Sequence, residues 1–214
     1  MSFKIDELFK TEEEFKEFVV NEVLNHIGEY AFNVSINVFD TMEYVLKEKL
    51  AEFESKEDIE NTVASYYSFS KIEDQHSRKI RGMDIPLFGI LTVFKDNLET
   101  LVIEGYEDTD PLNVIKYVIA HECRHIMQDV FMRTNYGINQ LDVFNQFIKR
   151  AEKSYEANIM EIDADKYAKY KVFGKDTVKN PYINTLKLSE IYGYVLNEIR
   201  EWYCSGLLEF REVD

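Results

Sequence analysis

Residues 117–128, YVIAHECRHIMQ, constrain the fold more than any other part of this chain. Residues 112, 114, 115, 118 and 119 are apolar at helical spacing, which predicts an amphipathic helix with one buried side. Thr109 or Asp110 is suited to cap its start, with Pro111 in the first turn. Polar His and Glu side chains on such a helix are costly unless they are paired or bind a metal ion.

The spacing within HECRH gives each side chain a direction. His121 and His125 project side by side, about 40° apart around the helix axis. They can share one Zn²⁺ ion at about 2.0–2.1 Å from each nitrogen. Glu122 lies about 100° round from His121, where it can serve as the base for a metal-activated water without ligating the metal. Cys123 lies about 200° round and is predicted to be a core residue.

A catalytic zinc site needs a third protein ligand, with a fourth position left for water. The candidates are an acid downstream of the motif, His76 and His26. The downstream segment YEANIMEIDADKYAKY, residues 155–170, is the best of these, and Glu161 is its reference carboxylate. The side chains near Glu161 on this helix are Asp165, about 40° away, and three small ones within about 60°, Ala157, Ala164 and Ala168. Small residues let this helix approach the first one closely, as a shared ligand requires.

Three other charged side chains near the motif are predicted to be structural. Asp163 and Glu156 point away from Glu161 and are expected to face solvent. Arg124 can face either the cleft or a helix carboxylate, and we favour the carboxylate because salt bridges of helices are common.

HECRH followed by EIDAD resembles the gluzincin metallopeptidases, whose pattern is HExxH and then ExxxD or ExxAD on a second helix. The resemblance covers residues 85–172 and implies a small, minimal-gluzincin-like core. It implies Glu161 as the third zinc ligand and Asp165 as the residue that grips a ligand histidine, His121. It also implies a zincin-like short sheet whose edge strand borders the active site. The oxyanion-stabilising residue is left open among Tyr136, Tyr155, Tyr170 and His76.

The remaining pattern predicts an α+β chain, mostly helical, with a small antiparallel sheet packed on the HExxH helix and on the helix that carries Glu161. Thr11 and Glu14 form a capping box before a first helix, and FNVSINVF predicts a strand. The other predicted elements are a helix capped by Asp40, a helix over 56–69, a loop over 70–84, a hairpin of PLFGILTVF and TLVIEGY, and helices over 138–172 and 186–207.

These elements predict three segments. Residues 1–84 form a mainly helical extension or part of the same domain, residues 85–174 form the zincin-like core, and residues 175–214 form a helical segment packed on it.

The charge of −15 argues against nucleic acid and anionic membranes as partners. The N-terminus has no apolar signal region, and only two cysteines occur, so we expect a cytoplasmic protein without disulfides. Its composition suggests a bacterial or phage origin.

The predicted function is hydrolysis of peptide bonds by a zinc-bound water, with Glu122 as general base and a peptide or protein as substrate. A narrower version is cleavage of one dedicated protein partner. The alternative is a non-catalytic, acidic binding or inhibitory protein on a metallopeptidase-like scaffold. A purely structural motif helix is the third hypothesis. The sequence leaves the oligomeric state and the cleavage specificity open.

Overall fold

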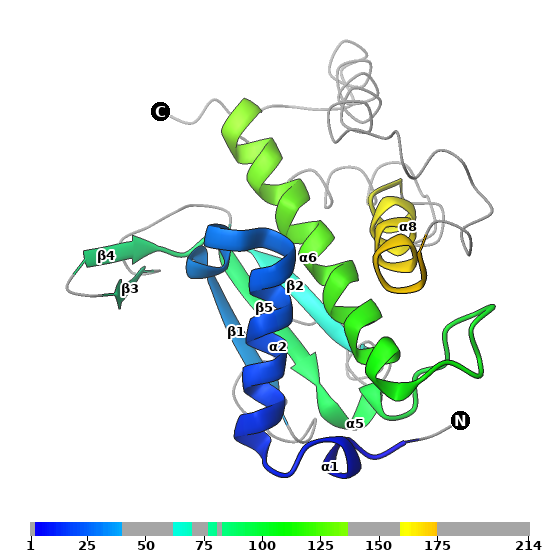
Figure 1. The fold of residues 1–214 in the computed structure, drawn as a ribbon. Coiled ribbons are helices and arrows are strands. Elements are labelled where there is room, and N and C mark those ends of the chain that lie inside the picture. The colour runs from blue at the N-terminus through cyan, green and yellow to red at the C-terminus, as the bar shows by residue number, and fades with distance from the viewer. Residues whose placement is uncertain (1–2, 40–61, 70–76, 81–82, 137–158, 175–214) are drawn as a thin grey trace.

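The computed structural model describes residues 3–39, 62–69, 77–80, 83–136 and 159–174. This part of the chain is α+β and mostly helical, with a small mixed sheet. Figure 1 shows how its elements are arranged. In chain order they are α1 (Ile5–Leu8), α2 (Glu12–Ile27), the 3-10 helix η1 (Gly28–Asn33), β1 (Val34–Phe39), β2 (Ala64–Ser68), β3 (Ser77–Ile80), β4 (Met83–Pro86), β5 (Gly89–Phe94), α5 (Lys95–Leu98), α6 (Pro111–Tyr136) and α8 (Ile159–Phe173).

The main sheet has the order β1-β5-β2, and it is mixed, not antiparallel as the sequence predicted. β5 pairs in parallel with β1 and antiparallel with β2. The predicted hairpin with TLVIEGY is wrong, because the chain after β5 forms the helical turn α5 and residues 101–110 form no strand. Both neighbours of β5 come from far upstream, and a local pattern of hydrophobic residues cannot reveal such pairing.

Two further predictions fail in the same region. Residues 64–68 form the strand β2, not part of a helix over 56–69. Residues 77–80 and 83–84, predicted as loop, belong to a separate antiparallel pair of strands, β3 and β4, which projects from the rest of the fold (Figure 1). The helix predicted after Asp40, the one over 186–207, and the whole segment 175–214 lie outside the described residues.

Gly89, at the start of β5, allows β2 to lie close against this strand. A Cβ atom at residue 89 would be 2.3 Å from the carbonyl oxygen of Tyr67 and 2.7 Å from the ring of Tyr66. Neither contact is possible for a real side chain, so glycine is required for the tyrosine ring to cross the strand here.

Helix α2 begins where the sequence predicted it. The N–H of Glu14 donates to Oγ1 of Thr11 at 3.1 Å, which caps the helix. Its buried residues recur every four positions, at Phe15, Val19, Val23 and Ile27. This spacing places them on one side of the helix, facing the hydrophobic core.

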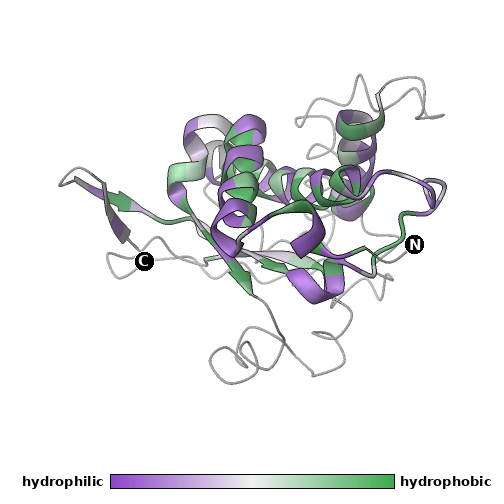
Figure 2. Ribbon diagram, turned by 60° about the horizontal axis from the view of Figure 1, so that its bottom comes forward, coloured by the Kyte–Doolittle hydropathy of each residue, from purple (hydrophilic) through white to green (hydrophobic). Residues whose placement is uncertain are grey.

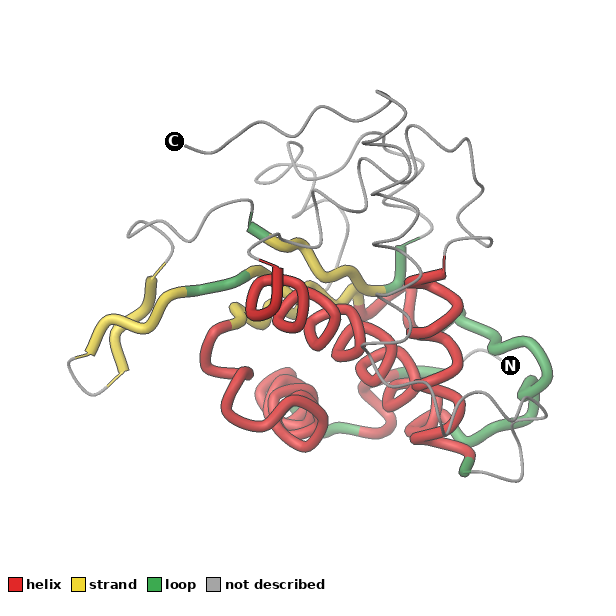
Figure 3. The backbone as a smooth tube through the Cα atoms, turned by 90° about the horizontal axis from the view of Figure 1, so that it is seen from above, coloured by secondary structure: helices red, strands yellow, loops and turns green. Residues whose placement is uncertain are grey.

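The core lies between the sheet and the two helices α2 and α6, which cover the same face of the sheet (Figure 3). Both helices alternate hydrophobic and hydrophilic stretches along their length, as expected of helices with one buried side (Figure 2). Fully or nearly fully buried members from the three elements are Val19, Val23, Leu91, Val93, Ile115 and Ile119. The strand predicted over FNVSINVF, residues 32–39, is confirmed as β1 over residues 34–39, so residues 1–84 supply α2 and two strands of the sheet around β5.

Helix α8 runs beside α6 and ends at Gly174, whose φ of 82° is the left-handed conformation common after a helix (Figure 1). Ala164 and Ala168 are fully buried, so the expected small residues of this helix do allow a close approach. At the start of α6, Asp110 accepts a hydrogen bond from the N–H of Leu112 at 2.8 Å, which makes Asp110 the cap. Among the described residues, no helix combines the length and apolar character needed to cross a bilayer.

Candidate metal centre

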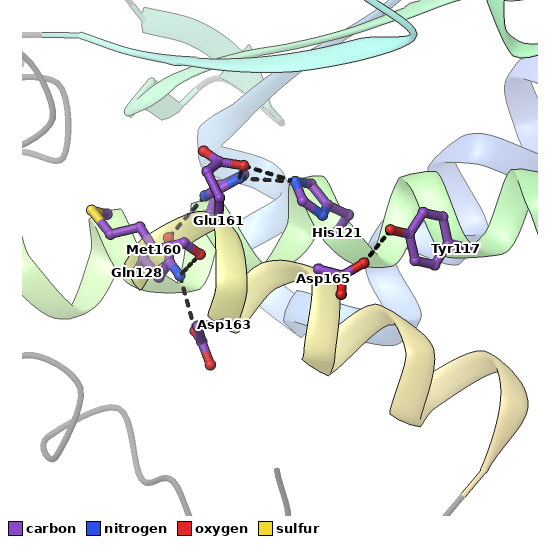
Figure 4. Close-up of polar contacts among 8 residues, drawn as sticks. Tyr117, His121, Gln128, Met160, Glu161, Asp163 and Asp165 are labelled. Atoms are coloured by element: carbon purple, nitrogen blue, oxygen red, sulfur yellow. Dashed lines mark hydrogen bonds and ion pairs between the residues drawn. The ribbon is translucent and has the colours of Figure 1, made fainter. Parts of the chain in front are cut away.

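Three predicted ligands meet where α6 and α8 lie side by side. His121 and His125 come from successive turns of α6. Glu161, in the first turn of α8, points toward His121 (Figure 4). The Nε2 atoms of the two histidines are 3.2 Å apart. Each of them lies 3.3 Å from Oε2 of Glu161. Three atoms that can each ligate a metal therefore form a nearly equilateral triangle.

The size of this triangle matches a tetrahedral metal site. Ligand atoms at about 2.0–2.1 Å from a tetrahedral zinc ion are separated from one another by about 3.3–3.4 Å. The observed separations of 3.2, 3.3 and 3.3 Å fall at or just below that range. The group is buried, with His121 its most accessible member at 16% side-chain exposure. It could hold one metal ion, and among the described residues no other His, Cys, Asp or Glu side chain belongs to the group.

The charges at the triangle leave Glu161 ionised and make His125 more basic than an ordinary histidine. Burial raises the pKa of Glu161, but the adjacent histidines outweigh it and hold the pKa well below its usual range. For His125, burial lowers the pKa, and the Glu161 carboxylate outweighs that effect and raises the pKa to about 9. Glu161 is thus an ionised ligand, and a buried carboxylate needs positive charge beside it.

Glu122 is buried directly beside the ligands. Burial raises the pKa of its carboxyl group, and the nearby His121 and His125 partly offset that rise. Its side chain also accepts a hydrogen bond from the backbone N–H of Tyr66 on β2. A carboxyl group with a raised pKa is a stronger base than an ordinary glutamate, as general acid–base chemistry near neutral pH requires.

The edge of the sheet borders this site. The backbone groups of Val63 and Phe69 bond to Phe94, the last residue of β5, and to Phe88, just before β5. The backbone groups of Ala64, Tyr66 and Ser68 therefore point to the opposite edge of β2. In the described ranges β2 pairs with β5 alone. The hydrogen bond from Tyr66 to Glu122 therefore places the free edge of β2 next to the ligands.

Asp165 does not make the contact that the resemblance implied. Its Oδ1 accepts a hydrogen bond from the hydroxyl of Tyr117 at 2.5 Å, and its Oδ2 lies 3.1 Å from Nζ of Lys169. Within the described residues no hydrogen bond joins Asp165 to His121. Figure 4 shows the carboxylate turned toward Tyr117, one helical turn before His121. The expected grip on His121 is replaced by a tyrosine–aspartate pair.

Asp163 was predicted to face solvent, and this prediction is wrong. It is buried at 7% exposure and receives two hydrogen bonds from the guanidinium group of Arg124, at 2.7 and 3.1 Å. The prediction that Arg124 faces a helix carboxylate is thereby confirmed. The sequence prediction takes Glu161 as the centre of the side of α8 that faces α6, whereas the centre of that buried side is Ala164. Glu161 lies about 60° to one side of that centre and Asp163 about 100° to the other, so both reach α6.

Gln128 is a supporting residue that sequence reasoning missed. It is fully buried, and its side chain lies 2.8 Å from Nδ1 of His125. Its amide nitrogen reaches α8, at 3.1 Å from the carbonyl oxygen of Met160 and 2.9 Å from Asp163 (Figure 4). The available signal was its position three residues after His125, which places both side chains on one side of a helix.

The other candidates that the structure describes do not join the triangle. His26 at the end of α2 contacts the hydroxyl of Tyr167 at 3.1 Å instead. Cys123 is buried in the core as predicted, and burial raises the pKa of its thiol. Tyr170 lies nine residues after Glu161 on α8, which is about 13 Å along the helix axis. His76, Tyr155, Glu156 and Ala157 lie outside the described residues, as does the side chain of Tyr136.

Comparisons of this chain with protein-family models, curated proteins and solved structures find no match.

Proposed function

We propose that this chain is a zinc-dependent metallopeptidase in which His121, His125 and Glu161 hold the metal ion and Glu122 is the general base. The observation that carries the proposal is the triangle of ligand atoms, 3.2–3.3 Å on each side, with a buried carboxyl group of raised pKa beside it. A structural zinc site has four protein ligands, whereas a catalytic one has three and an open position.

The ligand types favour zinc over the other divalent ions. Two imidazoles and one carboxylate suit zinc, whereas magnesium and calcium select oxygen ligands. When bound, zinc supplies a Lewis acid that polarises a carbonyl group and makes water a stronger acid.

The chain's own contribution to the reaction is proton transfer and positioning. Glu122 takes a proton from the attacking water and later gives it to the leaving amine. The substrate is an extended peptide that adds as a strand to the edge of β2 opposite β5, where the backbone groups of Ala64 and Ser68 and the carbonyl group of Tyr66 are directed. The N–H of Tyr66 at this edge is bonded to Glu122. The TLVIEGY segment, predicted as the other strand of a hairpin, forms no strand and offers no such edge.

The Glu122→Gln variant tests the proposal. The amide keeps the size of the side chain and cannot accept a proton, so hydrolysis of a peptide library should fall by about 10²–10⁴-fold or more. Zinc content measured by elemental analysis should be unchanged, because Glu122 is not a ligand. Glu104→Gln, which changes an exposed acid away from the site, is the control and should keep full activity.

Two results would contradict the proposal. Turnover of Glu122→Gln near the wild-type rate would remove this residue from the reaction. Wild-type hydrolysis that survives complete removal of metal by a chelator would remove the metal centre from it. A third result would narrow the proposal. If the wild type cleaves one protein of a cell lysate but no library peptide, and Glu122→Gln cleaves neither, the chain is a protease dedicated to one partner.

A further inference from the structure

The amide of Gln128 can adopt only one orientation. Its nitrogen faces the carbonyl oxygen of Met160 at 3.1 Å and the carboxylate of Asp163 at 2.9 Å. Both partners are acceptors without a proton, so the group that faces them must be the NH₂. The side-chain oxygen of Gln128 is then directed at Nδ1 of His125, 2.8 Å away.

This orientation decides which nitrogen of His125 carries a proton. An amide oxygen accepts hydrogen bonds and cannot donate them, so Nδ1 of His125 must be the protonated nitrogen. In a neutral imidazole the other nitrogen then has a free lone pair. That nitrogen is Nε2, which is the atom in the triangle with His121 and Glu161.

The orientation of Gln128 is fixed in turn by a clamp between the two helices. Arg124 donates two hydrogen bonds to Asp163, so the carboxylate keeps its position beside the amide of Gln128. Arg124 and Gln128 come from α6, whereas Asp163 and Met160 come from α8. Met160 and Asp163 flank Glu161 in the chain, so the same contacts hold the carboxylate ligand at its distance from the histidines.

We propose that Gln128 is a positioning residue of the metal centre: it holds His125 as the Nδ1–H tautomer with Nε2 toward the metal, and the Arg124–Asp163 pair holds Gln128. This inference rests on the proposed metal centre. It adds that the side-chain amide of Gln128 holds the ligand His125 in place. Hydrogen bonds to the far nitrogen of a ligand histidine fix its tautomer and its ring orientation, and their loss typically lowers metal affinity by about 10–100-fold.

The test compares the zinc affinity of three full-length proteins by competition with a chelator of known affinity. Gln128→Leu keeps the approximate size of the side chain and removes the acceptor, so we expect zinc to bind about 10–100-fold more weakly than in the wild type. Met132→Ala is the matched control, since Met132 is also fully buried on α6, one turn further along, and makes no hydrogen bond to His125. It should lower the thermal stability and leave the zinc affinity unchanged.

A second measurement on the wild-type protein needs no substitution. In the zinc-loaded protein, ¹⁵N chemical shifts of the His125 ring should show a protonated Nδ1 and a zinc-bound Nε2. Zinc at Nδ1 would overturn the inference, and it would do so even if Gln128→Leu failed to fold.

The outcomes separate the inference from the proposed function. Equal zinc affinity of folded Gln128→Leu and wild type would overturn the role of Gln128 and leave the metal centre standing. A wild-type protein that binds no zinc would overturn the metal centre and this inference with it. Weaker binding in Gln128→Leu but not in Met132→Ala, together with a protonated Nδ1, would support both.

Discussion

At the scale of single residues, the two histidines of the proposed metal centre have different neighbours. His125 contacts Gln128 through the ring nitrogen that faces away from the triangle. His121 has Tyr117 as its neighbour on the same side of α6, and the hydroxyl of Tyr117 donates to Asp165. The HExxH–ExxAD pattern alone would assign Asp165 to a histidine, whereas the structure gives the supporting role at His125 to a glutamine outside that pattern.

Asp165→Asn tests this difference. The carboxylate is 36% exposed and contacts Tyr117 and Lys169, neither of which is a ligand. Loss of such a partly exposed pair typically costs less than about 1 kcal/mol, so zinc affinity should fall less than about fivefold. The measurement is chelator competition alongside Tyr117→Phe, which removes the same hydrogen bond from the other side. A drop of 10-fold or more in Asp165→Asn with none in Tyr117→Phe would return Asp165 to the role that the resemblance implied.

His26 gives a prediction for the pH dependence of stability. Burial, with a smaller effect from the charge of Lys171, lowers the pKa of His26 to about 4. An unfolded chain binds a proton at this histidine near pH 6.5, whereas the folded chain does not until about pH 4, so the free energy of unfolding should decrease as pH falls through this interval. The His26→Gln variant should show a smaller decrease from pH 7 to pH 5 in chemical denaturation. An identical decrease in both proteins would show that His26 titrates alike in both states.

At the scale of elements, a buried network fixes β2 to α6. The hydroxyl of Tyr66 donates to Oδ2 of Asp129 at 2.7 Å, and Arg133 pairs with the same oxygen at 2.9 Å. Arg133 also donates to Oγ of Ser68 at 2.7 Å and to the carbonyl oxygen of Phe69. The middle and the C-terminal end of β2 are thus tied to α6, and Tyr66 carries the backbone N–H that bonds Glu122.

Tyr66→Phe should therefore destabilise the fold. It removes one hydrogen bond to a buried charged group, which typically contributes about 1.5–3 kcal/mol. Tyr67→Phe is the matched control, because it removes a hydroxyl from the next residue of the same strand without touching this network. Urea denaturation of both variants gives the comparison. Equal stability of the two would mean that the hydroxyl of Tyr66 adds nothing to the attachment of β2.

The sequence predicted correctly the features that depend on neighbouring residues within one helix. The predictions that failed concern residues whose position depends on contacts with other elements. The cap at Thr11 and the burial of Cys123 follow from helical spacing and local hydrogen bonds. Helical spacing on α6 and the resemblance on α8 singled out the three ligands, and the structure brings them together. The burial of Asp163 depends on which side of α8 packs against α6. The sequence of α8 by itself does not give the centre of that contact. The strand β2 was misread because its neighbour β5 lies more than 20 residues along the chain.

At the scale of the whole molecule, the metal centre depends on both halves of the described chain. Residues 1–84 provide α2, which packs on α6, and β2, whose edge borders Glu122. The ligands come from α6 and α8, further along the chain. The same core that stabilises the fold therefore sets the orientation of α6, and through α6 the direction of both histidines.

The most direct test of the account is elemental analysis of the purified protein beside its Glu161→Ala variant. We predict about one zinc ion per wild-type chain, the number that one triangle of ligands can hold. Loss of a ligand should weaken binding by more than the 10–100-fold expected for a supporting residue, so Glu161→Ala should lose its zinc on dialysis against a moderate chelator. A wild-type chain without zinc, or a Glu161→Ala variant that keeps all of it, would contradict the central claim that two helices share one metal ion.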